Sequence, residues 1–144
     1  MQPATVEKVV SAMGDGERIG IDAALVNAEF ERTVARTPGI SMLLLATADG
    51  RAVADWSTLK ADPRRLAAMT NSLLTLSETV VRELGLASAD NATIATRQGN
   101  MVLIRLEHAR PLTLAAMGSP DTNTGTLLFA ARDCAVRLAQ LLHP

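Results

Sequence analysis

The pattern of apolar and polar positions is most regular between Asp62 and Gly85. Large apolar side chains recur there at spacings of three and four residues, which is typical of one face of a helix. They are Leu66, Met69, Leu73, Leu76, Val80 and Leu84. Asp62 is a favourable N-cap, Pro63 suits the first helical position, and Gly85 stands where a left-handed C-terminal cap is needed. The pattern predicts one helix over this whole segment.

The same helix carries a second stripe of smaller residues, shifted along the chain by one position. Its members are Ala67, Thr70, Leu74, Ser77 and Val81. We expect the stripe of large residues to pack on a sheet of the same chain. The second stripe is then left for a different surface, and it predicts an assembly contact.

Two further helices and five strands complete the pattern. The helices are expected over residues 22–37 and 123–142, each beginning at a capping residue. The strands are expected at Ile40–Ala46, Ala52–Trp56, Asn91–Thr96, Met101–Leu106 and Leu112–Met117. The third of these is rich in Thr and Ala, as at the edge of a sheet.

The connections between neighbouring strands determine how the strands pair. Asp49-Gly50 is a strong hairpin signal, and we interpret residues 97–100 as another turn. Links this short exclude parallel crossovers, so these strands are expected to be antiparallel. The run Ile40–Ala46 is apolar almost throughout, which indicates a strand covered on both faces. We therefore predict a mixed α/β (α+β) fold, a three-layer α/β/α sandwich.

Residues 1–20 form a weaker element. Val6, Val9, Val10 and Met13 have helical spacing, and Gly14-Asp15-Gly16 ends the pattern. A chain of 144 residues is the usual size of a single domain. We predict an N-terminal extension or short helix over residues 1–20 and one domain over residues 21–144.

Composition narrows the classes of function. The net charge is −1, and the chain holds one Trp, two Phe and no Tyr, which argues against nucleic-acid binding. The longest apolar run, Met42–Ala46, is too short to span a bilayer, and residues 1–10 do not resemble a signal peptide. We therefore expect a cytoplasmic protein that does not insert into a membrane.

Residues with reactive or ligating side chains are few and scattered. His108 and His143 have no partner at metal-ligand spacing, and the lone Cys134 excludes an internal disulfide and is expected to be buried. Asp121 and Asp133 are separated by twelve residues, and nothing in the pattern brings them together. Phosphate-binding loops and nucleophile elbows are absent from the sequence. We expect no catalytic residue, no cofactor and no metal.

Two features of the sequence each have two possible interpretations. Arg64 and Arg65, in the first turn of the long helix, are either an anion clamp or a solvated basic pair. Trp56 either covers the core or is exposed as a contact residue, since Trp is enriched in binding hot spots.

The whole pattern resembles the roadblock (dynein light chain) family. Gly39–Gly50 is similar to the first strand and hairpin of that family, Leu66–Leu76 to its central helix, and Gly118–Gly125 to its loop into the last helix. The resemblance covers about residues 22–142. It implies a five-stranded antiparallel sheet with one helix on one face and two on the other.

The resemblance also implies a function. Members of the family are non-catalytic adaptors, and bacterial members are commonly regulators or partners of small Ras-like GTPases, including the activator of the gliding-motility GTPase. They form homodimers in which the central helices lie side by side and an edge strand joins the two sheets. For this chain, that implies a dimer interface at the second stripe and at the edge strand, namely Ala67, Thr70, Leu74, Ser77, Val81 and Thr93.

A GTPase is then expected on the platform formed by the two central helices. Its contact residues would be the outward polar strip of Arg64, Arg65, Ala68, Asn71, Thr75, Glu78 and Arg82. The alternative is that this strip is only solvated. Two other functions compete: a structural dimerisation module without a GTPase partner, and an enzyme or small-ligand binder, against which the absence of a convergent polar cluster argues.

Overall fold

The computed structural model describes residues 20–88, 91–106 and 108–142. In chain order the elements are α2 (Ala23–Arg36), β1 (Ile40–Thr47), β2 (Ala52–Ser57), α3 (Pro63–Glu83), β3 (Ala92–Thr96), β4 (Gly99–Leu106), β5 (Leu112–Gly118) and α4 (Thr124–Leu141). Residues 1–19 of the N-terminal element predicted over residues 1–20, and His143, lie outside the described residues. All the other predicted helices and strands are present.

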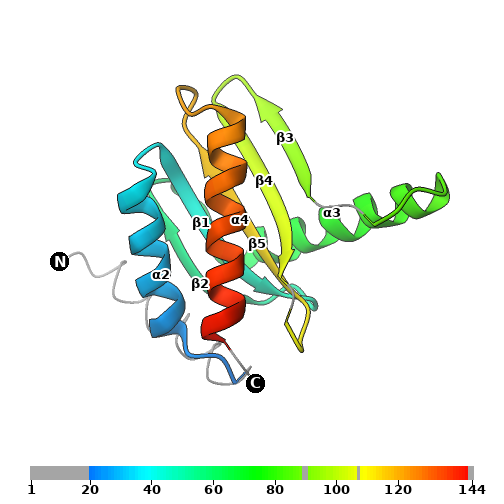
Figure 1. Cartoon of the computed structure of the whole chain (residues 1–144), viewed down its shortest axis with the longest axis horizontal. Coiled ribbons are helices and arrows are strands. Elements are labelled where there is room, and N and C mark those ends of the chain that lie inside the picture. The colour runs from blue at the N-terminus through cyan, green and yellow to red at the C-terminus, as the bar shows by residue number, and fades with distance from the viewer. Residues whose placement is uncertain (1–19, 89–90, 107, 143–144) are drawn as a thin grey trace.

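The strands form one five-stranded antiparallel sheet in the order β2-β1-β5-β4-β3. Helices α2 and α4 cover one face of this sheet, and α3 crosses the other face (Figure 1). Each face has its own apolar core, with Phe30 and Leu127 on the α2 and α4 side and Leu74 on the α3 side. The three-layer sandwich predicted from the sequence is confirmed.

The helix ends follow the predicted capping residues. The side chains of Asp22, Asp62 and Asn123 each accept a hydrogen bond from a backbone N–H of the first turn, at 2.9, 3.0 and 2.7 Å. At the other end of α3, Gly85 adopts a φ of +70°, and its N–H donates to the Arg82 carbonyl at 3.0 Å. These caps use local side chains, and the sequence pattern located them for that reason.

Strand β4 begins two residues earlier than predicted. Gly99 pairs with Thr96, so only Arg97 and Gln98 remain as the turn between β3 and β4. Gly99 has a φ of +140°, and a Cβ there would lie 2.1 Å from the Gly118 carbonyl oxygen. Only glycine fits this close approach, so the residue that looked like a turn signal is part of the strand.

The orientation of α3 about its own axis differs from the prediction by one residue position, a rotation of roughly 100°. Ala67, Thr70 and Leu74 are buried against the sheet, with at most 4% of their surface exposed. The stripe of large residues, expected on the sheet, is exposed from Met69 to Leu84, and its first member, Leu66, is partly buried against the core under α3 as predicted.

Packing explains why the small residues face inward. The sheet surface under α3 already carries large side chains, including Met42, Leu44 and Leu103. Protein interiors are close-packed, so the small side chains of Ala67 and Thr70 suit this contact, and Leu74 is the fully buried large side chain that α3 adds to this core. Hydrophobicity alone does not contain this information, because it ranks the larger stripe as the better candidate for the core.

Candidate functional site

A run of exposed apolar side chains lies on α3 and the residue just past its cap. Six side chains there have 36–67% of their surface exposed, and the first five follow one another at helical spacing. They are Met69, Leu73, Leu76, Val80, Leu84 and Leu86, and we call them the α3 apolar face. A contiguous apolar patch on a folded domain indicates an interaction surface.

The free edge of the sheet lies beside this surface. Strand β3 is at the end of the strand order, and its outer edge has no neighbouring strand among the described residues. Thr93, Ala95 and Thr96 of this strand are exposed, and α3 runs behind the sheet and extends past β3 (Figure 1). An open edge presents unpaired N–H and C=O groups, which makes it a template for another strand.

A polar cluster on the opposite flank of α3 fixes the rotation of the helix. Arg105 of β4 forms an ion pair with Glu78 at 2.9 Å and donates hydrogen bonds to Asn71 at 2.9 Å and Thr75 at 3.0 Å. It also donates to Thr113 of β5 at 2.6 Å. We call Arg105, Glu78, Asn71 and Thr75 the Arg105 cluster. Hydrogen bonds with a charged partner are the stronger ones, so this cluster keeps the α3 apolar face turned away from the sheet.

The predicted partner-binding residues divide into two groups. Asn71 and Thr75 belong to the Arg105 cluster, and the Asn71 amide also donates to the Ala48 carbonyl at 2.6 Å, so these two are used inside the chain. The others are exposed along α3, as the prediction required: Arg64, Arg65, Ala68 and Arg82.

The predicted dimer residues are also placed differently from one another. Ala67, Thr70 and Leu74 are core residues, so the prediction that they face outward is wrong. Ser77 and Val81 are partly exposed, and Thr93 is exposed on the sheet edge. The sequence did contain the signal for the outward residues, since the stripe of large side chains was recognised and only its direction was misjudged.

Reactive and ligating side chains are dispersed in the part of the chain that the structure describes. Within the described ranges, no three His, Cys, Asp or Glu side chains come together as metal ligands. Cys134 is buried, and burial raises the pKa of its thiol to about 11, so it is a poor nucleophile at neutral pH. Trp56 is half-buried against the core on the α2 and α4 side, which decides between its two interpretations in favour of the core. None of the helices in the described segments is long and apolar enough to span a bilayer.

Comparison with known families agrees with this geometry. Residues 27–116 match the sequence model of the Roadblock/LC7 domain. The chain belongs to the Roadblock/LC7 family. The match begins within α2 and ends within β5, so it includes both α3 and β3 of this roadblock chain.

Solved structures share the fold of this roadblock chain. MglB from Myxococcus xanthus superposes with a TM-score of 0.72 at 14% identity, over 81% of this chain and 93% of that one. The gliding protein MglB from Thermus thermophilus gives 0.70 at 15% identity, over 83% and 90%. An MglB with a tetrameric arrangement gives 0.71 at 18%, over 83% and 89%. No curated protein sequence matches the chain.

Proposed function

We propose that this roadblock chain is a homodimeric, non-catalytic adaptor of the cytoplasm that binds a small Ras-like GTPase. The observation that carries the proposal is the α3 apolar face next to the open edge of β3. A surface of this kind needs a partner, and a second copy of the chain supplies one with the same two features.

A two-fold axis would bring equal surfaces together. In such an arrangement each α3 apolar face covers the other, and the two β3 edges pair to extend the sheet. Burial of a Leu or Met side chain contributes roughly 1.5–3 kcal/mol, and a stable interface buries on the order of 1,600 Å². The half-buried Met101 and Met117, on the same side of the sheet as α3, extend the surface available for this contact. The tetrameric arrangement of one MglB supports self-association as a property of this fold.

The GTPase would lie on the polar side of the paired α3 helices. Arg65, Ala68 and Arg82 are exposed there, and the dimer would present the strip twice. The resemblance to bacterial regulators of small GTPases supports this partner. A projecting loop that would insert an arginine is not visible among the described residues, so we expect any effect on hydrolysis to arise from the switch loops of the GTPase itself.

Binding to nucleotide-loaded GTPases tests the proposal. The chain is immobilised and exposed to small Ras-like GTPases of its own organism, loaded with GDP or with a GTP analogue. We expect one of them to bind in a nucleotide-dependent way, and the double substitution Arg65→Glu with Arg82→Glu to weaken binding at least tenfold while the dimer persists. Unchanged affinity would place the docking surface elsewhere. If no GTPase binds and the chain is still a dimer, the adaptor is a structural dimerisation module.

A further inference from the structure

The outer edge of β3 does not offer its backbone groups at every residue. Thr96 pairs with Gly99 across a turn of two residues, so these two residues exchange both backbone hydrogen bonds. Hydrogen-bonded pairs alternate along an antiparallel ladder, so Ile94 bonds inward to β4, whereas Thr93 and Ala95 do not. The N–H and C=O groups of Thr93 and Ala95 therefore point away from β4, toward the open edge.

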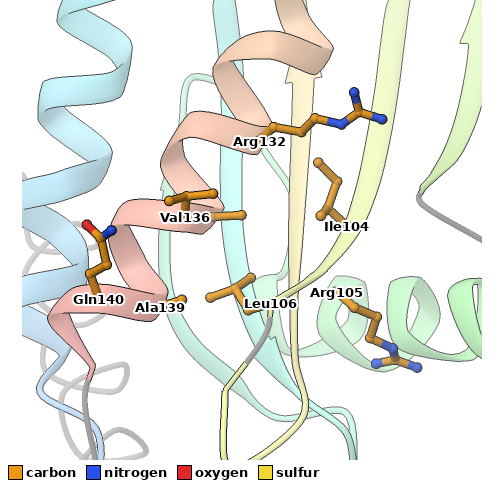
Figure 2. Close-up of a pocket in the computed structure, with 8 residues that line it drawn as sticks. Ile104, Arg105, Leu106, Arg132, Val136, Ala139 and Gln140 are labelled. Atoms are coloured by element: carbon orange, nitrogen blue, oxygen red, sulfur yellow. The ribbon is translucent and has the colours of Figure 1, made fainter.

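The side chains of β3 alternate between the two faces of the sheet. On the neighbouring strand β4, Arg105 reaches α3, whereas Ile104 lies on the side of α4 (Figure 2). Met101 of β4 is on the α3 side, and Ile94 is its partner in the register. Ile94 is therefore a half-buried apolar residue on the α3 side, and its two neighbours in β3 are exposed on the other side.

A second copy of β3 matches this edge best in one alignment. Two-fold symmetry makes the two strands antiparallel, and hydrogen bonds form only where outward groups face outward groups. An axis at Ile94 places Thr93 opposite the partner's Ala95 and aligns all five residues of β3 with their counterparts. An axis at Thr93 or at Ala95 also matches outward groups, but it aligns only three of the five residues.

We propose that two copies of this chain join their sheets with the two-fold axis at Ile94. Each Thr93 then exchanges both backbone hydrogen bonds with the partner's Ala95. The inference rests on the proposed homodimer and adds the register of its seam. The two Ile94 side chains face each other across the axis on the α3 side, as a pair that is not hydrogen-bonded and whose Cα atoms are about 4.5 Å apart.

The same register covers the apolar side chain of the edge. Ile94 and its neighbour Met101 are half-buried in the single chain. In the dimer, Ile94 contacts its counterpart, and cross-strand pairs of β-branched side chains stabilise a sheet. An axis at Thr93 would instead bring two threonines together on the exposed side and place Ile94 opposite the partner's Ala92.

Disulfide trapping in the full chain tests the register. Ile94→Cys puts two thiols at the axis, where Cα atoms about 4.5 Å apart satisfy the geometry of a disulfide. The matched control is Thr93→Cys, because its two thiols are diagonal neighbours roughly 7–8 Å apart, which is too far for a disulfide. The buried native Cys134 is present in both variants and gives both the same background. Under a glutathione redox buffer, we expect Ile94→Cys to form covalent dimers at least fivefold faster than Thr93→Cys.

A mixture of two variants gives an independent readout. Thr93→Cys and Ala95→Cys chains are combined under reducing conditions, allowed to exchange subunits and then oxidised. These two positions face each other in the proposed register, so the mixture is expected to give a disulfide between unlike chains. Each variant alone should give at most one fifth of that yield.

The outcomes separate this inference from the proposed function. Faster trapping of Thr93→Cys than of Ile94→Cys would move the axis and overturn the register. A stable dimer in which neither Ile94→Cys nor the mixture is trapped would overturn it as well, since the β3 edges would then lie apart. In both cases the homodimer of the proposed function survives. Sedimentation of the wild-type chain as a monomer would overturn the homodimer and the register together.

Discussion

Arg105 and Glu78 are 27 residues apart in the chain and form an ion pair of 2.9 Å across the boundary between β4 and α3. Each side chain is only 25–31% exposed, so the pair is partly shielded from water. Asn71 and Thr75 complete the arrangement by accepting hydrogen bonds from the same guanidinium. The pair holds α3 at one rotation angle, and this angle decides which side of the helix other molecules meet.

Replacement of Arg105 tests this role. Arg105→Met keeps much of the side-chain volume and removes every hydrogen bond that Arg105 donates, which leaves Glu78 without its cation. We expect the free energy of unfolding in urea to fall by about 1–3 kcal/mol. Arg97→Met, in the exposed turn between β3 and β4, is the matched control and should change it by less than about 0.5 kcal/mol. Equal values for the two variants would show that the cluster contributes nothing to stability.

Two neighbouring leucines of α3 should respond in different ways to the same substitution. Leu76 is 61% exposed on the α3 apolar face, so Leu76→Asp should give a folded monomer. Leu74 is 2% exposed, so Leu74→Asp should cost several kcal/mol and unfold the chain. Sedimentation equilibrium at micromolar concentration and far-ultraviolet circular dichroism measure the two effects. Sedimentation of the wild-type chain as a monomer would rule out the proposed dimer.

Gly99 should tolerate substitution far less than Gly85. An alanine at 99 would need both a φ of +140° and a Cβ 2.1 Å from the Gly118 carbonyl oxygen, so the strands must move apart. We expect a loss of roughly 2–4 kcal/mol for Gly99→Ala. Gly85 has a φ of +70° with open space around it, so Gly85→Ala should cost only about 1 kcal/mol. Thermal unfolding of both variants provides the comparison, and similar losses would contradict it.

Cys134 predicts a dependence of stability on pH in the alkaline range. Burial raises the pKa of its thiol from 9.0 to about 11 in the folded chain. Between these values the unfolded chain releases the proton and the folded chain retains it, so stability falls as pH rises from 9 to 11. The loss should approach 2–3 kcal/mol, since one pKa unit corresponds to about 1.4 kcal/mol. Urea titrations at pH 8 and pH 11 measure it, and Cys134→Ala should remove this component of the difference.

The sequence predicted the elements well because most of their signals are local. Asp22, Asp62 and Asn123 cap helices with hydrogen bonds to residues two positions away, and the Asp49-Gly50 hairpin is equally short-range. The order of elements then limits the possible sheets, and the antiparallel sandwich follows.

The sequence and the structure both place the candidate surface on α3 and β3, but the sequence pattern favoured the wrong side of α3 for the sheet contact. The side chains that decide its rotation are on strands: Met42, Leu44 and Leu103 fill the space beneath it, and Arg105 holds its flank. These contacts join segments far apart in the chain, and helical periodicity contains no information about them. Gly99 was misjudged for a similar reason, because its close neighbour Gly118 belongs to another strand.

The inward placement of the small residues separates two kinds of evolutionary constraint on α3. Ala67, Thr70 and Leu74 are constrained by the fold of the chain itself, because their volumes must fit the sheet. Met69 and Leu76 are constrained mainly by the molecules that contact the chain from outside, because most of their surface is exposed. Substitutions at Met69 and Leu76 can therefore change which proteins bind this surface without disturbing the fold of the chain. If the chain pairs with itself as proposed, two copies that arise by gene duplication have a short mutational path from a homodimer to an obligate heterodimer.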